Sequence, residues 1–468
     1  MRMPSQKLFE DLAAYANSYA DSLDTRPVSP TASTEELREA LHRPLPEAPT
    51  EEDDVIANLI EVCEPGLLHT AGPNFFGWVI GGALPASQAA DWLATVWDQN
   101  AGGFACSPAI GVLEEVCGAW LKELLGLPES ASFALVTGCQ MAHVTGLAAA
   151  RYRLLERAGW DVGTQGLCGA PRLRVLSGEH HHETLGRALR LLGLGTNIIE
   201  RLPLDANRKL DPVALRAALE AEPDLGPRTI VCLQAGDLNT GTCDDFSLLC
   251  DIAHEHGAWV HVDGAFGLWG RVSPALRGLL NGVEKADSWA TDGHKWLNVP
   301  YDSGYAFVAD AEAHRACMAM EASYLIDGGG REAHEYNPEW SKRARALPTY
   351  AAIRALGRQG IAEMVERCSA LAARLVSEIG ALPGAELLHA PTLNQGLVRF
   401  LADDGNHDAL TDEVAEALRI DGGTWFGNST WQGIRAMRVS VCSWQTQDSH
   451  VDDAVARVER VLASITSR

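Results

Sequence analysis

The stretch Trp-Val-His-Val-Asp-Gly-Ala-Phe-Gly (259–267) decides the fold, together with Ala-Thr-Asp-Gly-His-Lys-Trp (290–296), which follows it. The first stretch is an apolar run that ends in Asp263 and two small residues. The second places Lys295 on a turn between two apolar runs. A lysine in that position is badly placed if it serves only as a charge, but its amine is well placed to form an imine with a carbonyl.

Asp263 and Lys295 are the two groups that pyridoxal 5′-phosphate needs from a protein. A carboxylate at the end of a strand can keep the ring nitrogen protonated, and a lysine can form the Schiff base. The alternatives are an aspartate that caps a turn and a lysine on the surface. Trp289 and Trp296 favour burial of Lys295, and we expect burial and the neighbouring His294 to lower the pKa of its amine.

Between residues 90 and 310, short β-rich runs alternate with longer helical runs. This alternation predicts an α/β fold in which a mostly parallel sheet is covered by helices on both faces. The expected strands are 132–137, 173–176, 197–202, 229–234, 259–262 and 304–308, and the expected helices are 145–157, 185–192, 211–220 and 244–256. Ligands of such sheets bind outside the carboxyl ends of the strands. Thr137, His182, Asp263 and Lys295 fall at or near these ends.

Changes in sequence character predict three segments. Residues 1–85 are expected to form an N-terminal arm, because prolines interrupt their helical pattern. Residues 86–315 form the expected large cofactor-binding domain, and residues 316–468 a mobile loop followed by a smaller α+β domain. In this last segment we expect helices at 345–357, 361–379 and 452–465 and strands at 396–400 and 437–441.

Composition bounds the partners and the compartment. The chain has 468 residues, a formal net charge of −24 and 11 cysteines without a Cys-x-x-Cys pair. The acidic balance argues against nucleic acid and anionic membranes as partners. The sequence has no apolar run long enough to span a bilayer, and its N-terminus lacks a signal-peptide core. Together with the scattered cysteines, these features predict a cytoplasmic protein with reduced thiols.

Two loops and a histidine run complete the candidate site. Thr137-Gly138-Cys139-Gln140 lies between a strand and a helix, where backbone N–H groups can bind a phosphate. Gly236-Asp237-Leu238-Asn239-Thr240-Gly241 follows a buried strand and either lines the pocket or is a simple turn. The run His180-His181-His182 is not spaced like metal ligands, so no metal site is expected. One of its imidazoles is suited to stacking on a cofactor ring.

These motifs, in this order, resemble the group II pyridoxal-phosphate-dependent amino-acid decarboxylases. That fold-type I family includes the glutamate and aromatic-L-amino-acid decarboxylases. The resemblance extends from Phe75 to Thr446, most of the chain. It is carried by Thr-Gly-Cys-Gln-Met-Ala-His (137–143), His182, Ala-Gly-Asp-Leu-Asn-Thr-Gly (235–241), His-Val-Asp-Gly-Ala (261–265) and Thr-Asp-Gly-His-Lys-Trp (291–296). Ser-Lys-Arg-Ala-Arg-Ala-Leu (341–347) resembles the family's basic motif after a mobile loop.

The resemblance implies a role for each candidate residue. Lys295 forms the internal aldimine and Asp263 binds the pyridinium nitrogen. Ala265 packs on the cofactor ring, and His182 stacks on its opposite face and touches the substrate carboxylate. The residues implied to hold the phosphate are Gly138, Cys139, Gln140, Asp292 and His294.

The resemblance also implies the reaction. A tyrosine on the family's mobile loop protonates the carbon that has lost CO2, and Tyr336 is the nearest match, with Tyr324 as the second candidate. The implied activity is conversion of an L-amino acid, aromatic or acidic, to its amine and CO2. It is carried out by a homodimer with active sites at the subunit interface.

Two alternatives to this activity stay open. The first is another reaction of the same cofactor, such as aminotransfer, C–C or C–S lysis, or decarboxylation coupled to condensation or oxidation. The second is a non-catalytic cofactor-binding subunit. The phosphate loop departs from the family's usual Ser-Gly-Gly-Ser-Glu-Ala-Asn, and the loop after the buried strand carries Asp237 where Thr is usual. These departures affect substrate choice more than cofactor use.

Overall fold

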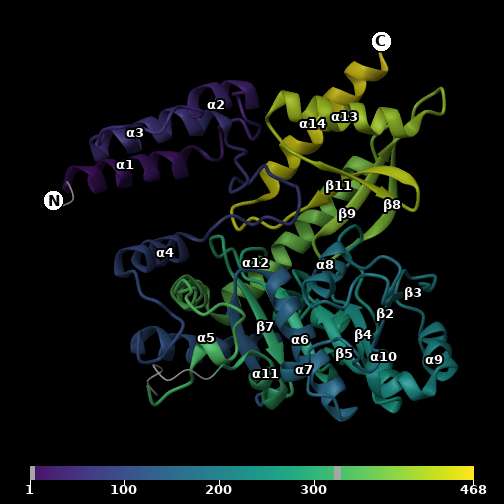
Figure 1. Cartoon of the computed structure of the whole chain (residues 1–468). Coiled ribbons are helices and arrows are strands. Elements are labelled where there is room, and N and C mark those ends of the chain that lie inside the picture. Colours follow the sequence, from purple (N-terminus) through teal and green to yellow (C-terminus); the bar gives the residue numbers. More distant parts are fainter. Residues whose placement is uncertain (1–5, 321–327, 468) are drawn as a thin grey trace. The chain divides into compact units, whose positions relative to one another are not determined.

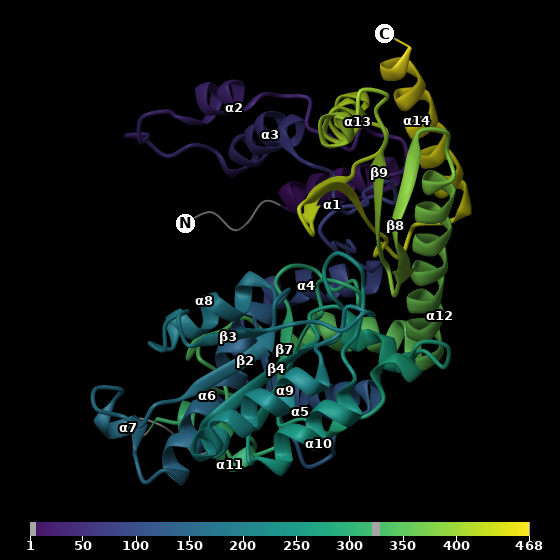
Figure 2. The same ribbon diagram turned by 90° about the vertical axis from the view of Figure 1, so that its right-hand side faces the viewer.

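The computed structural model describes residues 6–320 and 328–467, and the chain divides into two compact units. The first unit consists of Met1–Ile80, Leu371–His389 and Leu397–Arg468, and the second of Gly81–Ala370 and Ala390–Gly396. Helix α12 (Ala346–Gly380) passes from the second unit into the first (Figure 2). Its helical conformation is interrupted at Gly357, where φ is 60°. The predicted pair of helices on either side of Gly357 is therefore confirmed.

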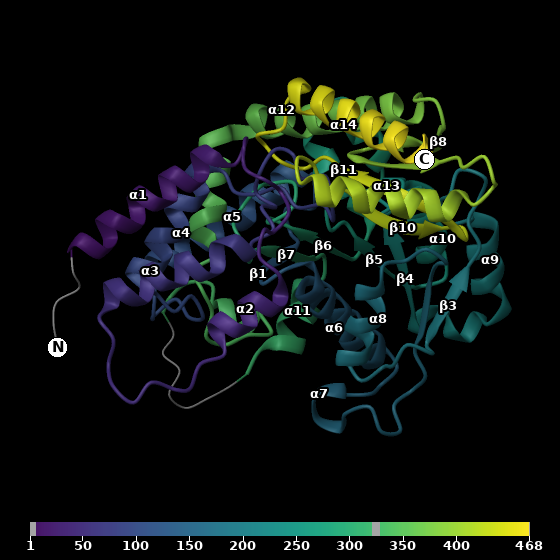
Figure 3. The ribbon, with the colours of Figure 1, turned by 90° about the horizontal axis from the view of Figure 1, so that it is seen from above.

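A seven-stranded sheet forms the centre of the second unit. Its strand order is β1-β7-β6-β5-β4-β2-β3. Figure 3 shows this sheet from above, with every strand except β2 labelled. Strand β7 pairs antiparallel with both β1 and β6, and the remaining neighbours are parallel. The strands are β1 (Ser132–Val136), β2 (Arg174–Gly178), β3 (Ile199–Leu202), β4 (Thr229–Gln234), β5 (Trp259–Asp263), β6 (Ser288–Asp292) and β7 (Gly304–Val308). The predicted mostly parallel α/β fold is confirmed.

The central strands are buried on both faces, as their apolar sequences require. Every residue of β1, β6 and β7 is buried. In β5 the first four residues are buried, and the last residue, Asp263, is half-buried. Because side chains alternate along a strand, Trp259, His261 and Asp263 share one face of β5. A Cβ placed on Gly146 of helix α6 (Cys139–Arg157) would lie 3.0 Å from the His261 ring, so α6 covers that face.

Helix α6 begins earlier than the sequence predicted. We expected the helix to start at Thr145, but it starts at Cys139, directly after Gly138. Its first turns are almost completely buried, so they lack the polar and apolar alternation that marks a helix covering a surface. The correction matters because it places His143 on the helix, four residues after Cys139. The other helices of this unit are α4 (Pro85–Trp97), α5 (Pro108–Leu125), α7 (Val162–Gln165), α8 (Glu183–Leu191), α9 (Pro212–Ala221), α10 (Phe246–Glu255) and α11 (Ala311–Met318).

The first unit contains a four-stranded sheet of order β10-β11-β9-β8 (Figure 1). The predicted strands β9 (Gln395–Phe400) and β11 (Ile434–Ser440) are confirmed, and β8 (Ala385–Thr392) and β10 (Gly427–Trp431) were not predicted. Phe76 stacks on Phe426 with ring centroids 5.3 Å apart, which fixes residues 75–78 to this sheet. The helices of this unit are α1 (Gln6–Ser22), α2 (Thr34–Leu41), α3 (Glu52–Cys63), α13 (His407–Asp421) and α14 (Asp448–Thr466).

Among the described helices, none combines the length and the apolar character that crossing a bilayer requires. The predicted segment boundaries at 85 and 315 stay predictions.

Candidate active site

The candidate site lies at the carboxyl ends of β1, β5 and β6. Asp263 ends β5, Asp292 ends β6, and Lys295 follows Asp292 by three residues. Gly138 and Cys139 follow β1 and begin α6. Because β1, β6 and β5 run in the same direction, these groups meet at one edge of the sheet, as the sequence predicted.

Lys295 is held by Asp292. Its Nζ lies 3.1 Å from Asp292 Oδ2, and the exposed fractions of the two side chains are 23% and 3%. Burial acts to lower the pKa of Lys295, but Asp292, Cys139 and Asp263 outweigh burial and raise the pKa above its ordinary value. The expectation that burial and His294 would lower the pKa was wrong, because the sequence did not reveal that the Asp292 carboxylate lies against the amine.

Asp263 is surrounded by donors from two segments, the turn after β5 and helix α6. Its Oδ1 accepts the Ala265 N–H at 3.1 Å and lies 3.9 Å from Cys139 Sγ, and its Oδ2 lies 3.5 Å from His143 Nε2. Burial acts to raise the pKa of Asp263, but His143, His182 and Lys295 hold it well below its usual range. The carboxylate is therefore ionised and suited to binding a protonated ring nitrogen.

The start of α6 forms a narrow cradle. A Cβ on Gly138 would lie 2.9 Å from His294 Cε1 and 3.3 Å from Asp292 Oδ1, so only glycine fits without movement. The Cys139 N–H donates to Asp292 Oδ1 at 2.5 Å. Gln140 Nε2 donates to the Thr184 carbonyl at 3.2 Å, whereas Gln140 Oε1 is buried and has no partner among the described residues.

His294 is oriented by its neighbours. The Ser303 N–H donates to His294 Nδ1 at 3.1 Å, so the ring proton lies on Nε2, which faces Asp292 Oδ1 at 3.3 Å. The ring stacks on Tyr301 with centroids 4.3 Å apart. Burial lowers the pKa of His294, and the imidazole is therefore neutral at physiological pH.

The remaining predicted residues occupy different places. His182 is exposed at the N-terminus of α8, where its Nδ1 accepts the Thr184 N–H at 3.3 Å. The Tyr336 ring lies under the Arg331 guanidinium, 3.9 Å from ring centroid to Cζ, and its carbonyl accepts a hydrogen bond from His314. His314 also contacts Ser132 at the start of β1, the end of that strand opposite to Lys295. Tyr324 lies outside the described residues.

The loop after β4 turns back on itself. Asp237 Oδ1 accepts the N–H groups of Asn239 and Thr240 at 3.0 and 2.8 Å, so this oxygen stabilises the turn. Asp244, which closes the loop, is buried and accepts two backbone N–H groups; burial raises its pKa to about 6. Asp237, whose loop was expected either to line the pocket or to be a simple turn, thus commits one carboxylate oxygen to that turn.

Sequence reasoning missed the histidines beneath Asp263. His143 and His261 are 1% and 0% exposed, and their rings contact each other through Nδ1 and Nε2 at 2.9 Å. The available signal was the alternation of Trp259, His261 and Asp263 along a single strand. His143 could be found only once α6 was known to start at Cys139.

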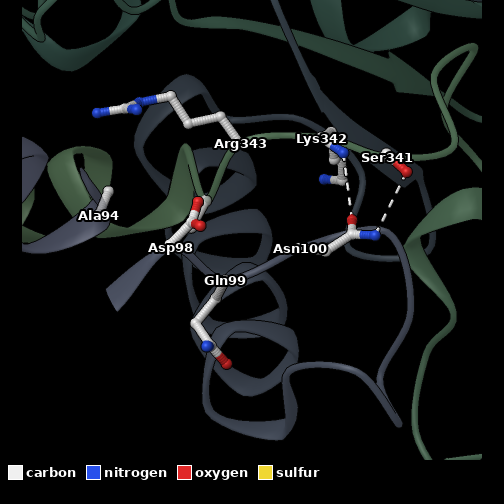
Figure 4. A pocket seen from close by; sticks show the side chains of 8 residues that line it. Ala94, Asp98, Gln99, Asn100, Ser341, Lys342 and Arg343 are labelled. Atoms are coloured by element: carbon white, nitrogen blue, oxygen red, sulfur yellow. Dashed lines mark hydrogen bonds between the residues drawn. The ribbon is translucent and has the colours of Figure 1, made fainter. Parts of the chain in front are cut away.

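The basic stretch 341–347 is mostly committed to ion pairs. Lys342 Nζ pairs with Glu114 inside the protein, where the two side chains are 1% and 3% exposed. Asn100 binds the Ser341 hydroxyl and the Lys342 N–H, beside a cavity of about 460 Å³ (Figure 4). Arg343 lines the same cavity and pairs with Asp91.

The site fits pyridoxal 5′-phosphate on three observations. Asp263 offers an ionised carboxylate, Lys295 offers an amine, and the glycine cradle at Gly138 opens beside the buried and unpartnered Gln140 Oε1. Cys139, His143 and Asp263 place one ligand atom each within 4.8 Å of one another, a set that also suits a metal ion. His143 Nδ1 contacts His261 at 2.9 Å and His143 Nε2 faces Asp263 at 3.5 Å, and these two contacts account for the arrangement without one.

A lysine and a carboxylate so placed on this sheet define an enzyme that uses pyridoxal 5′-phosphate. The family model described as the pyridoxal-dependent decarboxylase conserved domain matches residues 34–402, and the chain belongs to this family of pyridoxal-phosphate-dependent amino-acid decarboxylases. Its cofactor is pyridoxal 5′-phosphate.

Named relatives agree with this assignment, and a solved structure shares the fold. The chain is 25% identical to L-tyrosine/L-DOPA decarboxylase 2 of Lophophora williamsii, over 96% of this chain and 92% of that protein. It is 26% identical to 4-hydroxyphenylacetaldehyde synthase of Rhodiola rosea, over 97% and 94%. The crystal structure of Oryza sativa TDC with PLP and tryptamine matches with a TM-score of 0.92 at 23% identity, covering all of both chains.

Proposed function

We propose that this protein converts an L-amino acid, aromatic or acidic, to its amine and CO2. The observation that carries the proposal is the placement of Lys295 and Asp263 at the carboxyl ends of neighbouring strands, inside a chain whose family decarboxylates amino acids. The relative named as a tyrosine and DOPA decarboxylase supports an aromatic substrate. When bound, pyridoxal 5′-phosphate supplies the electron-withdrawing ring that makes loss of CO2 feasible.

The protein's residues hold and orient the reactants. Lys295 supplies the amine that binds the cofactor aldehyde, and Asp263 keeps a proton on the ring nitrogen. Gly138 and Gln140 offer the backbone start of α6 to the phosphate, and the Cys139 N–H can join them only by leaving Asp292 Oδ1. His182, exposed on the loop before α8, is available to the substrate carboxylate.

Asp292 and His294 have a narrower role in this proposal. The Asp292 carboxylate occupies the Cys139 N–H and faces His294 Nε2. Because a carboxylate accepts hydrogen bonds and repels a phosphate, we assign Asp292 to holding Lys295. His294 then orients Asp292.

A screen of L-amino acids tests the proposal. Purified, cofactor-loaded protein is incubated with each amino acid, and CO2 and amine are measured together. Equal yields from an aromatic or acidic substrate are expected. Lys295→Ala should abolish turnover and the yellow colour of the bound cofactor, whereas Lys285→Ala, an exposed lysine paired with Asp251, should change neither. Turnover by Lys295→Ala at the wild-type rate would refute the role of Lys295.

A second candidate function is decarboxylation coupled to oxidation, which yields an aldehyde in place of the amine. The similarity to 4-hydroxyphenylacetaldehyde synthase, a relative named for an aldehyde product, over 97% of the chain supports this second candidate. The same screen separates the two, because the oxidative reaction consumes O2 and water and releases aldehyde, ammonia and hydrogen peroxide in step with CO2. Formation of a keto acid without CO2 would instead indicate aminotransfer. No turnover of any L-amino acid by loaded protein would favour a non-catalytic subunit.

We also propose that the protein is a homodimer. Helix α4 supports this proposal, because Trp92, Leu93, Val96 and Trp97 are 43%, 43%, 68% and 50% exposed on neighbouring turns. Such a cluster of large apolar side chains is typical of an interaction surface. Val96→Glu should yield monomers in sedimentation analysis, whereas Val213→Glu, at an equally exposed apolar position on α9, should leave dimers intact.

The cytoplasm is the compartment we propose. All eleven cysteines are free thiols in the structure, which supports a reducing environment. Localisation of the tagged chain by cell fractionation tests this placement, and recovery outside the cytoplasm would refute it.

A further inference from the structure

A continuous line of hydrogen-bonding side chains runs beneath Asp263, through the core between β5, β6 and α6. Trp259 Nε1 donates to Ser288 Oγ at 2.9 Å, and Ser288 Oγ contacts His261 Nδ1 at 2.8 Å. His261 Nε2 contacts His143 Nδ1 at 2.9 Å, and His143 Nε2 faces Asp263 Oδ2 at 3.5 Å. The four side chains below Asp263 are between 0% and 2% exposed.

His143 Nε2 lies 3.5 Å from both Asp263 Oδ2 and Cys139 Sγ, and because the Asp263 carboxylate can only accept, the proton of His143 belongs on Nε2. The indole of Trp259 can only donate, so Ser288 accepts from it and has its own proton left for His261 Nδ1. His261 then carries its proton on Nε2 and donates to His143 Nδ1. His143 in turn carries its proton on Nε2 and donates to the ionised Asp263. The line is therefore directional: every proton points toward the carboxylate.

Burial keeps His261, in the middle of this line, neutral. Burial, with a smaller contribution from His143, lowers the pKa of His261 to about 3. Gly146 makes room for the line, because a Cβ there would lie 3.0 Å from the His261 ring and 3.3 Å from Ser288 Cβ. A glycine inside a helix is unfavourable by itself, so its presence next to His261 is consistent with a need for space.

We propose that His143 is a positioning residue for Asp263: it donates a hydrogen bond to Oδ2, keeps the carboxylate ionised and oriented, and so holds the proton on the cofactor ring nitrogen. His261, Ser288 and Trp259 fix the tautomer of His143. In the motif that this phosphate loop resembles, asparagine stands where the present chain has His143.

Other charged and titratable groups also face Asp263, and the proposal takes them into account. His143 and Cys139 approach from α6, His181 and His182 from the loop before α8, Lys295 and Asp292 from β6 and the turn that follows it, and Cys232 from β4. Of these, His143 is the buried donor within reach of Oδ2. His182 is exposed, and Lys295 is committed to Asp292.

The test measures the ring nitrogen itself and needs no substrate. The protein is loaded with nitrogen-15-labelled pyridoxal 5′-phosphate, and the nitrogen chemical shift and the visible absorbance are followed against pH. In the wild type the ring nitrogen should stay protonated across the stable pH range. In His143→Leu the nitrogen signal should move toward that of an unprotonated ring, because Asp263 without this donor is a stronger base and competes for the proton. His143→Gln retains an N–H donor and should restore most of the protonation.

Controls separate this effect from loss of packing. His314→Asn alters another fully buried histidine, which binds Ser132 and the Tyr336 carbonyl, and it should leave the nitrogen signal unchanged. Ser288→Ala should move the nitrogen signal in the same direction as His143→Leu but less. If His143→Leu does not fold, Ser288→Ala tests the proposal in its place.

Two outcomes have different meanings. If His143→Leu folds, a wild-type nitrogen signal in both His143→Leu and Ser288→Ala would overturn the proposal. If His143→Leu does not fold, a wild-type nitrogen signal in Ser288→Ala alone would overturn it. Asp263→Asn serves as the reference: an unchanged nitrogen signal in that variant would refute Asp263 as the ring partner, which is a failure of the site assignment rather than of His143. An error in the substrate affects neither outcome.

Discussion

Replacing Asp292 with asparagine should make Lys295 a stronger nucleophile at neutral pH. Lys295 Nζ lies 3.1 Å from Asp292 Oδ2, and the two side chains are 23% and 3% exposed, so solvent screens this pair only weakly. A hydrogen bond between charged groups contributes about 1.5 to 3 kcal/mol, which corresponds to a pKa change of about 1 to 2 units. Asp292→Asn keeps the shape and removes the charge, so the pKa of Lys295 should fall by that amount.

The assay measures, as a function of pH, the rate at which the cofactor-free protein reacts with the aldehyde of pyridoxal 5′-phosphate. The midpoint of the rise in rate should move to lower pH in Asp292→Asn. Pyridoxal without its phosphate serves as a second probe, because any gain from reduced repulsion of the phosphate disappears with it. Asp287→Asn, on the residue before β6, changes a carboxylate that binds His254 and should leave the midpoint in place.

Stability gives an independent check of the sign. The pKa of Lys295 is raised in the folded state, so its ion pair stabilises the fold below the unfolded pKa of about 10.4, and this contribution is lost as pH rises through the folded pKa. Asp292→Asn should therefore lower the thermal midpoint near pH 8, with a smaller difference at strongly alkaline pH. A rate midpoint that is unchanged or moves upward would refute the reasoning.

Three further predictions follow from single contacts. Glu114→Ala or Lys342→Met breaks a buried ion pair and should destabilise the fold by about 3 to 5 kcal/mol, whereas the double variant Glu114→Leu with Lys342→Met should recover most of that loss in thermal unfolding. Gly241→Ala places a Cβ 1.9 Å from a backbone carbonyl oxygen and should lower the free energy of unfolding by about 3 kcal/mol. Gly159→Ala has a similar positive φ but open space around the Cβ, and it should lower the free energy of unfolding by about 1 kcal/mol. Equal thermal midpoints for the two variants would contradict the steric argument. Tyr336→Phe should lower the ratio of amine to CO2 if this tyrosine protonates the product, and an unchanged amine yield would assign that role to another group.

The stretches 259–267 and 290–296 were sufficient to predict the cofactor and the edge of the sheet where it binds. Strand ends in a parallel sheet meet at one edge, so Asp263 and Lys295 could be brought together without knowledge of the packing. The strands at 229–234 and 304–308 and the break at Gly357 were likewise predicted, because β-rich runs and glycine act locally.

What only the tertiary structure decided is the electrostatic state of those residues. The pKa of Lys295 is raised rather than lowered because the Asp292 side chain points at it, and a side-chain direction across a turn is not encoded in spacing. The alignment of His143 with His261 depends on where α6 begins and on its close approach to β5 over Gly146. The sequence by itself thus determined which chemistry the chain carries, whereas packing between segments distant in sequence decided which protons its site holds.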